Sequence, residues 1–369
     1  MHPDYPMKCG LQEISSESEI VRVFAYTQIG LWCWSNAGII WDVQRDELTF
    51  VDVLTDIKQT RAMLAAMKQV APDAKYKNLI YTHCDIDHIA GQQLIYDEVE
   101  NIYAREGCKA AMKGFYKSNF GVTMNVLHHI WHMLLKPLVN TQVLQILPRE
   151  RIPDSVAKLI AKISSVQFFE SFDWHNVDYS NSDRAPNTVV QESVIQLELG
   201  RLGLKKIEII PVAVDSHSNH DLIVRLPSAN VVFTGDILFH GMTPVNWAGT
   251  FENSIDASQL VASKSNAYTV FVPGHGAITK VGAFKKMEEY WKMLEAEYED
   301  CKRKELSPQT CARAVLETMP EKFKSWPDSE RAVINILVQY HFDASPSPSK
   351  TKLDKFEFIA EYAYAKLFL

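Results

Sequence analysis

The chain has 369 residues, of which 47% are hydrophobic and 22% charged, and its formal net charge is -7. This composition predicts a globular protein with a sizeable core, and a net negative charge without a long basic run argues against a nucleic acid as partner. No stretch reaches the roughly 18 apolar residues of a membrane span, and the N-terminus lacks the pattern of a secretory signal. The six cysteines form no CxxC pair. We therefore expect a cytoplasmic protein with reduced thiols.

The first half of the chain predicts a strand-rich layer and a strand, helix, strand unit. Helical spacing of apolar residues predicts a helix at 56–70, between two strands. The predicted strands are short, rich in β-branched and aromatic residues, and bounded by polar or glycine-containing breaks. Along the whole chain they lie at 19–28, 37–43, 47–55, 77–83, 192–200, 205–214, 220–228, 230–236 and 267–276. This alternation predicts an α/β layered fold.

The segment 105–190 is predicted to be a helical insert. Its aromatic residues favour either one wall of a substrate cleft, acting as a cap, or a core of the insert itself, and both interpretations stay open. After a catalytic domain at 25–280, preceded by an N-terminal segment at 1–24, a helical extension is predicted at 281–343. Within it, Ser307 and Pro308 predict the start of a helix.

A Ser- and Pro-rich linker and an apolar tail are predicted at 344–369. We expect the tail to pack on the body of the protein or on a second subunit, so a homodimer stays open.

Side chains that can bind metals gather at the ends of the predicted strands. In "THCDIDH", His83 and Asp85 lie on one side of an extended segment, and Asp87 and His88 follow where the chain turns into a helix. Later motifs are "DSHSNHD", "FTGD" and "VPGHG". The candidate ligands are His83, Asp85, Asp87, His88, His217, Asp236 and His275. Such strand ends meet at one edge of a sheet, and a cluster of imidazoles and carboxylates suits Zn, Fe or Mn better than Ca or Cu(I).

These four motifs, in this order, resemble those of the metallo-β-lactamase-fold hydrolase superfamily, whose first motif is usually His-x-His-x-Asp-His. The resemblance covers residues from about 25 to 345, least well within 105–190. It is closest to standalone hydrolases with a helical C-terminal extension. It implies an α/β fold, a metallo-β-lactamase-type αββα sandwich with a helical insert and a helical C-terminal extension.

The resemblance also implies a binuclear metal centre and a role for each ligand. His83, Asp85 and His217 would hold one ion and Asp87, His88 and His275 the other, with Asp236 bridging them. Asp87 would also be the catalytic group that orients a metal-held hydroxide or accepts a proton. The expected reaction is attack on an ester, thioester, lactone or amide carbonyl of a hydrophobic small molecule.

Asp85 departs from the family pattern, because a histidine usually stands at its position. An ionised Asp85 would add a third carboxylate and, together with Asp87, Asp236 and one hydroxide, would neutralise two divalent ions. A less positive centre makes bound water less acidic, and a carboxylate shifts the preference from zinc toward iron or manganese. Zinc is expected first, and three alternatives stay open: a di-iron oxygenase or oxidase, as in the flavodiiron proteins, a metal-assisted cyclase or lyase, and a metal-binding protein without turnover.

Four further residues are predicted to line the substrate cleft, namely Trp131, His220, His240 and Trp247. His217, rather than His220, is expected to bind the metal, because it precedes the strand "LIVRLP" by five residues, as the ligand does in relatives. Phosphodiesters and sulfate esters are less favoured as substrates, because no basic cluster lies near the motifs in the sequence.

Overall fold

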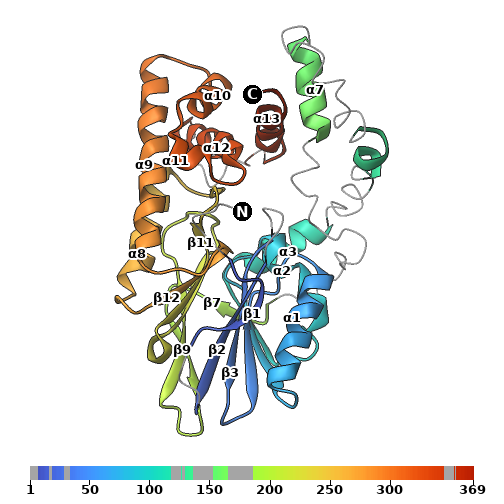
Figure 1. Ribbon diagram of the computed structural model, residues 1–369, viewed down its shortest axis with the longest axis vertical. Coiled ribbons are helices and arrows are strands. Elements are labelled where there is room, and N and C mark those ends of the chain that lie inside the picture. The colour runs from blue at the N-terminus through green and yellow to red at the C-terminus, as the bar shows by residue number, and fades with distance from the viewer. Residues whose placement is uncertain are drawn as a thin grey trace.

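The structure, a computed structural model, describes residues 7–15, 19–28, 34–117, 126, 129–135, 153–164, 186–344, 353 and 355–369. Two β-sheets face each other at its centre (Figure 1). Within these residues the first sheet has seven strands in chain order, antiparallel up to the fourth and parallel after it. They are β1 (Gly10–Glu13), β2 (Val21–Thr27), β3 (Ala37–Asp42), β4 (Glu47–Val51), β5 (Lys75–Ile80), β6 (Asn101–Arg105) and β7 (Thr188–Val190).

The second sheet has five strands in the described residues, in the order β12-β11-β10-β9-β8. All of its neighbours are antiparallel except β11 and β12, which are parallel. The strands are β8 (Ile195–Leu199), β9 (Lys205–Pro211), β10 (Leu222–Leu226), β11 (Val231–His240) and β12 (Val270–Gly276).

The alternation of side chains along the strands builds the layers. In β2, Val23 points into the core between the two sheets, whereas its neighbour Phe24 points to the outer face, where Met63 of α1 (Ile57–Val70) packs. In β10, Val224 points into the same central core, and Ile223 points outward to the helices of the second layer. The result is a four-layered αββα sandwich, as predicted.

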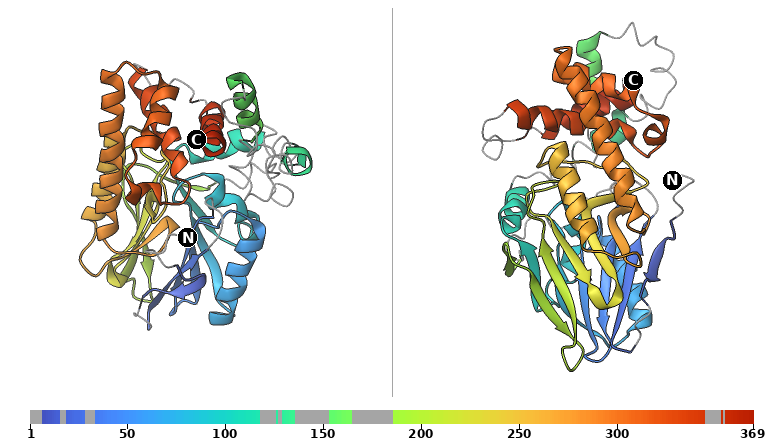
Figure 2. Two further views of the ribbon diagram at one scale, coloured as in Figure 1. Left: turned by 45° about the horizontal axis from the view of Figure 1, so that its top comes forward. Right: turned by 90° about the vertical axis from the view of Figure 1, so that its left-hand side faces the viewer.

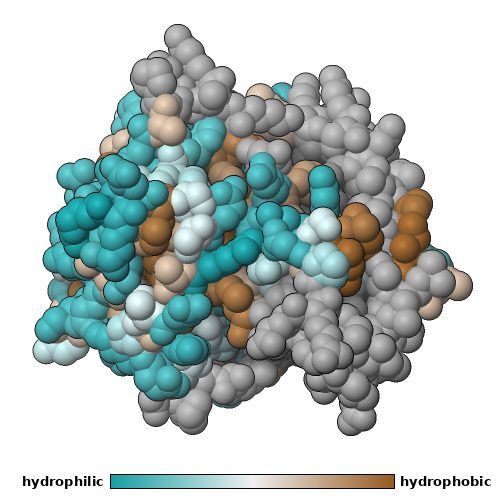
Figure 3. All heavy atoms as spheres, turned by 90° about the horizontal axis from the view of Figure 1, so that it is seen from above, coloured by the Kyte–Doolittle hydropathy of each residue, from teal (hydrophilic) through white to brown (hydrophobic). Residues whose placement is uncertain are grey.

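Helices cover the outer faces and extend beyond one edge of the sandwich. The side view in Figure 2 shows the long C-terminal helices beside the second sheet and above it. The longer helices beyond α1 are α3 (Cys108–Lys117), α7 (Asp154–Ser164), α8 (Phe251–Ser263), α9 (Gly282–Arg303), α10 (Pro308–Thr318), α12 (Ala332–Ala344) and α13 (Lys355–Phe368). Single turns form α2 (Ile86–Ile89) and α11 (Glu321–Lys324). Seen from above, the described surface of this region is mostly hydrophilic, with separate hydrophobic patches (Figure 3).

The C-terminal extension agrees with its sequence signals. The Ser307 side chain accepts a hydrogen bond from the backbone of Thr310, and Pro308 opens α10. The apolar tail forms α13, which packs against α7 and α12 of the same chain. None of the described helices combines the length and apolar character needed to cross a membrane.

The first sheet extends beyond the boundaries expected for the catalytic domain. β1 and the first residues of β2 precede residue 25, and β7 lies inside the predicted insert. Much of the insert and the linker at 345–352 lie outside the described residues.

Candidate metal centre

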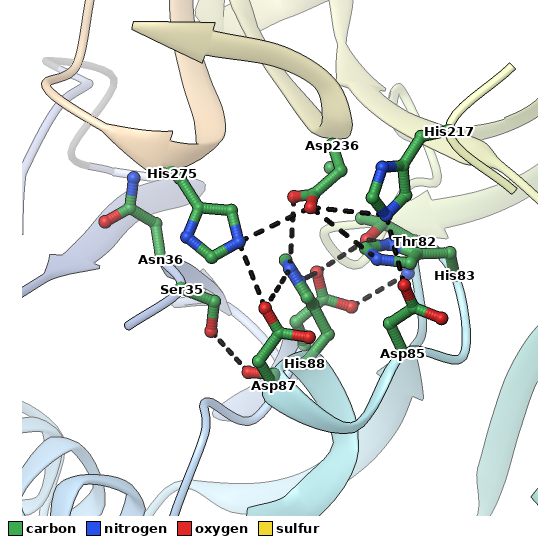
Figure 4. A network of polar contacts seen from close by, with 12 residues as sticks. Ser35, Asn36, Thr82, His83, Asp85, Asp87, His88, His217, Asp236 and His275 are labelled. Atoms are coloured by element: carbon green, nitrogen blue, oxygen red, sulfur yellow. Dashed lines mark hydrogen bonds and ion pairs between the residues drawn. The ribbon is translucent and has the colours of Figure 1, made fainter. Parts of the chain in front are cut away.

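The predicted ligands meet at the edge of the sandwich that faces the helical extension. The loop after β5 and the single turn α2 supply His83, Asp85, Asp87 and His88 from the first sheet. The second sheet supplies the other three, from the loop before β10, from β11 and from β12. They are His217, Asp236 and His275. Figure 4 shows these side chains pointing toward one another.

Backbone irregularities in the second sheet aim Asp236 into the cluster. The register between β11 and β12 shifts on both sides of Gly235, which has a φ of +51°. A residue with a side chain rarely adopts this conformation, so glycine suits the bend before Asp236. Gly274 lies so close that an added Cβ would be 1.8 Å from Asp236 Oδ1.

The ligand atoms form two groups that share Asp236. One group is His83, His217 and Asp236, and the other is Asp87, His88, Asp236 and His275. Asp236 Oδ2 lies 3.4 Å from His217 Nε2 and 3.3 Å from His275 Nε2, and Asp236 Oδ1 lies 3.1 Å from His88 Nε2. This division matches the two sites that the resemblance implies, although the role of each residue as a metal ligand stays a prediction.

Asp85 reaches the cluster from its most accessible side. Its Oδ2 lies 3.2 Å from His217 Nε2, but its side chain is 30% exposed, compared with 11% for Asp87 and 4% or less for the remaining ligands. It belongs to neither of the two tight groups. Asp85 therefore stands between the buried cluster and solvent.

Hydrogen bonds on the far side of three rings fix which nitrogen faces the cluster. His217 Nδ1 lies 2.6 Å from the carbonyl oxygen of Val245, so this nitrogen carries the proton. His88 Nδ1 donates to Asp52 at 2.9 Å. The Thr82 hydroxyl donates to Asp52, so the contact of His83 Nδ1 with Thr82 Oγ1 at 3.1 Å has the ring as donor. Each neutral ring then presents the lone pair of its Nε2 to the cluster.

The donor set fits divalent metal ions. Three nitrogen lone pairs converge with carboxylates, and all of these atoms are acceptors unless protons are added. Among the residues that the structure describes, His83 Nε2 and His88 Nε2 are buried and have no hydrogen-bond partner. Buried polar atoms normally have partners, and a cation shared by these acceptors would supply them.

Without a metal, the neighbouring carboxylates favour the protonated form of two of the imidazoles. Burial lowers the pKa of His217, but Asp236 and the hydrogen bond to Asp85 together raise it to about 9. Burial also opposes the charged form of His88, yet Asp236 and Asp52 raise its pKa well above the usual range. His83 behaves oppositely, because burial and the neighbouring His88 lower its pKa. Divalent ions would replace such protons, so metal binding should release them.

Residues outside the four motifs orient these ligands. Asp52 follows β4 and accepts hydrogen bonds from the backbone and hydroxyl of Thr82 as well as from His88. The extension contributes through Asn335 of α12, which accepts from the backbone of Asn246 and donates to the carbonyl of Pro244. These bonds hold the loop that carries the Val245 carbonyl. The sequence gives a signal for Asp52, because an aspartate directly follows the strand end "FV", but it gives none for Asn335.

The four predicted cleft residues are placed differently. Trp247 and His220 line a cavity of about 590 Å³ that also includes Asp85. His220 Nδ1 bonds the carbonyl of Glu106, away from the ligand cluster. His240 bonds the chain after β12 through Ala277 and does not line this cavity. Trp131 is buried in a π-helical turn near α7 and is not among the cavity residues either.

Comparison with known proteins gives a structural likeness only. No family model matches the sequence, and a search of curated proteins gave no significant match. Among solved structures, the stereoselective inverting sec-alkylsulfatase Pisa1 from Pseudomonas sp. is similar with 16% identity and a TM-score of 0.53. A double mutant of this sec-alkyl sulfatase gives 15% and 0.57.

Each comparison covers 94% of this chain, which spans about half, 52%, of the alkylsulfatase chain. A metallo-β-lactamase from Pontibacter korlensis was also found, with 11% identity, a TM-score of 0.48, and coverage of 76% of this chain and 99% of that one. With the two-sheet sandwich and the His/Asp cluster at its edge, the chain has the metallo-β-lactamase fold.

Proposed function

We propose that the protein is a metal-dependent hydrolase. The observation that carries this proposal is the convergence of three Nε2 lone pairs with carboxylates in a buried site. Asp236 belongs to both ligand groups, which supports a centre for two ions rather than one. Zinc is the first expectation for the metal, because imidazole nitrogens supply most of the donors.

Each of the two ligand groups would hold one ion, and Asp85 would join the group of His83 and His217. Bound there, they would supply Lewis acidity and an activated water for attack on an ester, thioester, lactone or amide carbonyl. Asp87 is the residue of this chain placed to accept the proton. Its backbone carbonyl accepts a hydrogen bond from Ser35 Oγ at 2.6 Å, and its Oδ2 lies 3.2 Å from His275 Nε2. These contacts hold the carboxylate at the rim of the cluster.

A di-iron redox enzyme is the second candidate. Asp85 supports it, because its carboxylate points at His217 where a histidine is usual in the fold, and oxygen ligands favour iron or manganese over zinc. The same ligand set would serve both functions, so the identity of the bound metal discriminates between them.

The test is metal analysis combined with a substrate screen. Protein purified without oxygen should contain about two zinc ions per chain and hydrolyse members of an ester and thioester panel. Asp236→Asn should lose metal and activity together, whereas Asp42→Asn, which changes a buried aspartate at the remote end of β3, should keep both. Stoichiometric iron with an oxygen-dependent activity would favour the redox enzyme. Failure to bind any metal after reconstitution would overturn both candidates.

A further inference from the structure

The ligand cluster is accessible on one side, and a cavity lies there. Asp85 is its most exposed member, at 30%, and it also lines the cavity of about 590 Å³. If the protein is the proposed hydrolase, a substrate that approaches the metal centre would lie in this cavity. The residues that line the cavity would then select the substrate, and this inference rests on the proposed function.

A single lysine from the end of the chain lines the cavity. Lys355 is the first residue of α13, which lies above the sheets, and its Nζ is 4.7 Å from the centre of the Trp247 ring (Figure 1). It forms no ion pair with any residue that the structure describes. It lines the same cavity as Asp85, beside the ligand cluster. An ammonium that forms no ion pair with the described residues, beside a candidate metal centre, can bind an anion.

The rest of the cavity combines an apolar wall with polar groups and two carboxylates. Trp247, Phe342 and Leu353 line it and pack against the buried core beneath the extension. His220 donates its Nδ1 proton to a backbone carbonyl. Besides Asp85, which is directed at His217, the acidic lining residue is Asp215, whose side chain lies on the exposed surface. An organic body would lie on the apolar wall and a negative group at Lys355.

We propose that this cavity binds substrates with an oxyanion group, a carboxylate or a sulfate, which Lys355 holds while their apolar part packs on Trp247. This assigns Lys355 as a specificity-determining residue. The helix dipole adds to its charge, because Lys355 lies in the first turn of α13. The sequence makes phosphodiesters and sulfate esters less favoured, because no basic cluster lies near the motifs, but the fold brings one basic side chain, Lys355, into the cavity from a distant part of the chain.

The binding test uses probes that contain no carbonyl ester. Hexanoate, hexyl sulfate and hexan-1-ol would be titrated by calorimetry into metal-free and zinc-loaded protein. At least one of the two anions should bind more tightly than the alcohol, and Lys355→Gln should weaken that anion about fivefold or more and leave the alcohol unchanged. The anion that binds more tightly identifies the preferred oxyanion group as carboxylate or sulfate. The matched control is Lys285→Gln, on the exposed surface of α9 and outside the cavity, which should alter neither.

A kinetic test separates this proposal from the proposed function. Mono-4-nitrophenyl glutarate carries a free carboxylate, and 4-nitrophenyl butyrate is its neutral counterpart. Lys355→Gln should raise KM for the anionic ester about fivefold or more, with kcat and the neutral ester unaffected. Equal effects on both esters, or none on anion binding in a variant with an unchanged unfolding midpoint, would overturn the role of Lys355. If the wild-type protein hydrolysed neither ester, the proposed hydrolase function would be refuted instead. The binding data would still decide whether Lys355 binds the anion.

Discussion

Asp52 provides the most direct test of how the ligands are oriented. Its side chain is buried, and its backbone has a φ of +58°, in the left-handed region. Oδ1 accepts from the backbone of Thr82 at 2.8 Å, and Oδ2 accepts from the Thr82 hydroxyl at 2.6 Å and from His88 Nδ1 at 2.9 Å. The substitution Asp52→Asn keeps the shape but replaces one acceptor by a donor.

Either orientation of the new amide disturbs the site. If its NH2 group takes the place of Oδ2, His88 Nδ1 must accept a hydrogen bond rather than donate one, and the ring proton moves to Nε2, which then cannot bind a metal. If the NH2 group takes the place of Oδ1, it opposes the backbone N–H of Thr82, and an unsatisfied buried donor costs about 1–3 kcal/mol. Loss of such a partner behind a ligand typically lowers metal affinity by about 10- to 100-fold. This corresponds to about 1.4–2.7 kcal/mol.

The assay is competition for zinc against a chromophoric chelator, with urea unfolding measured in parallel. Asp42→Asn is the matched control, because Asp42 is also buried and accepts from the backbones of Gln44, Arg45 and Gly200, far from the cluster. Both variants should lose stability, but only Asp52→Asn should lose metal affinity. Equal zinc affinity in the two variants would refute the inference that Asp52 sets the His88 tautomer.

Three further predictions concern the ligands themselves. Asp85→His removes one carboxylate and should raise kcat/KM on simple esters and move the alkaline activation to lower pH; unchanged metal content and pH profile in Asp85→Asn would place Asp85 outside the ligand set. In the metal-free protein the pKa of His217 is raised to about 9 from an ordinary value near 6.5, so its protonated form stabilises the fold below about pH 6.5 and this contribution is lost as the pH rises toward 9. Urea unfolding should show that decline, and a His217→Gln variant that keeps the full decline would contradict the assignment. Gly274→Ala would put a Cβ 1.8 Å from Asp236 Oδ1 and should reduce the bound metal well below that of Gly282→Ala, whose Cβ meets no atom within 4 Å.

The sequence was most informative where local patterns and strand ends coincide. His83 and His275 could be placed at one edge because each follows or ends a strand with an apolar run, and α/β folds place their sites at the carboxyl ends of strands. β1 was missed because "GLQE" is a short edge strand without a clear apolar alternation, and β6, "NIYAR", was missed as well.

Tertiary contacts explain the part of the site that could not be predicted. The pairing of Asp52 with Thr82 depends on the adjacency of β4 and β5, and Asn335 reaches the ligand loop only through the packing of α12. Lys355 lies on the tail, which the sequence marked only as apolar. No local periodicity indicates that it lines the same cavity as Asp85, because this placement arises from how the extension folds back.

The origin of the ligands in both sheets makes the metal centre a cross-link between the two halves of the sandwich. His83, Asp87 and His88 follow a strand of the first sheet, while His217, Asp236 and His275 belong to the second. Ions that bind only the folded arrangement stabilise it by mass action, so each tenfold rise in free metal above the dissociation constant adds about 1.4 kcal/mol per site. The stability of the folded chain would then depend on the metal supply of its surroundings, and chelation would remove this link between the two sheets.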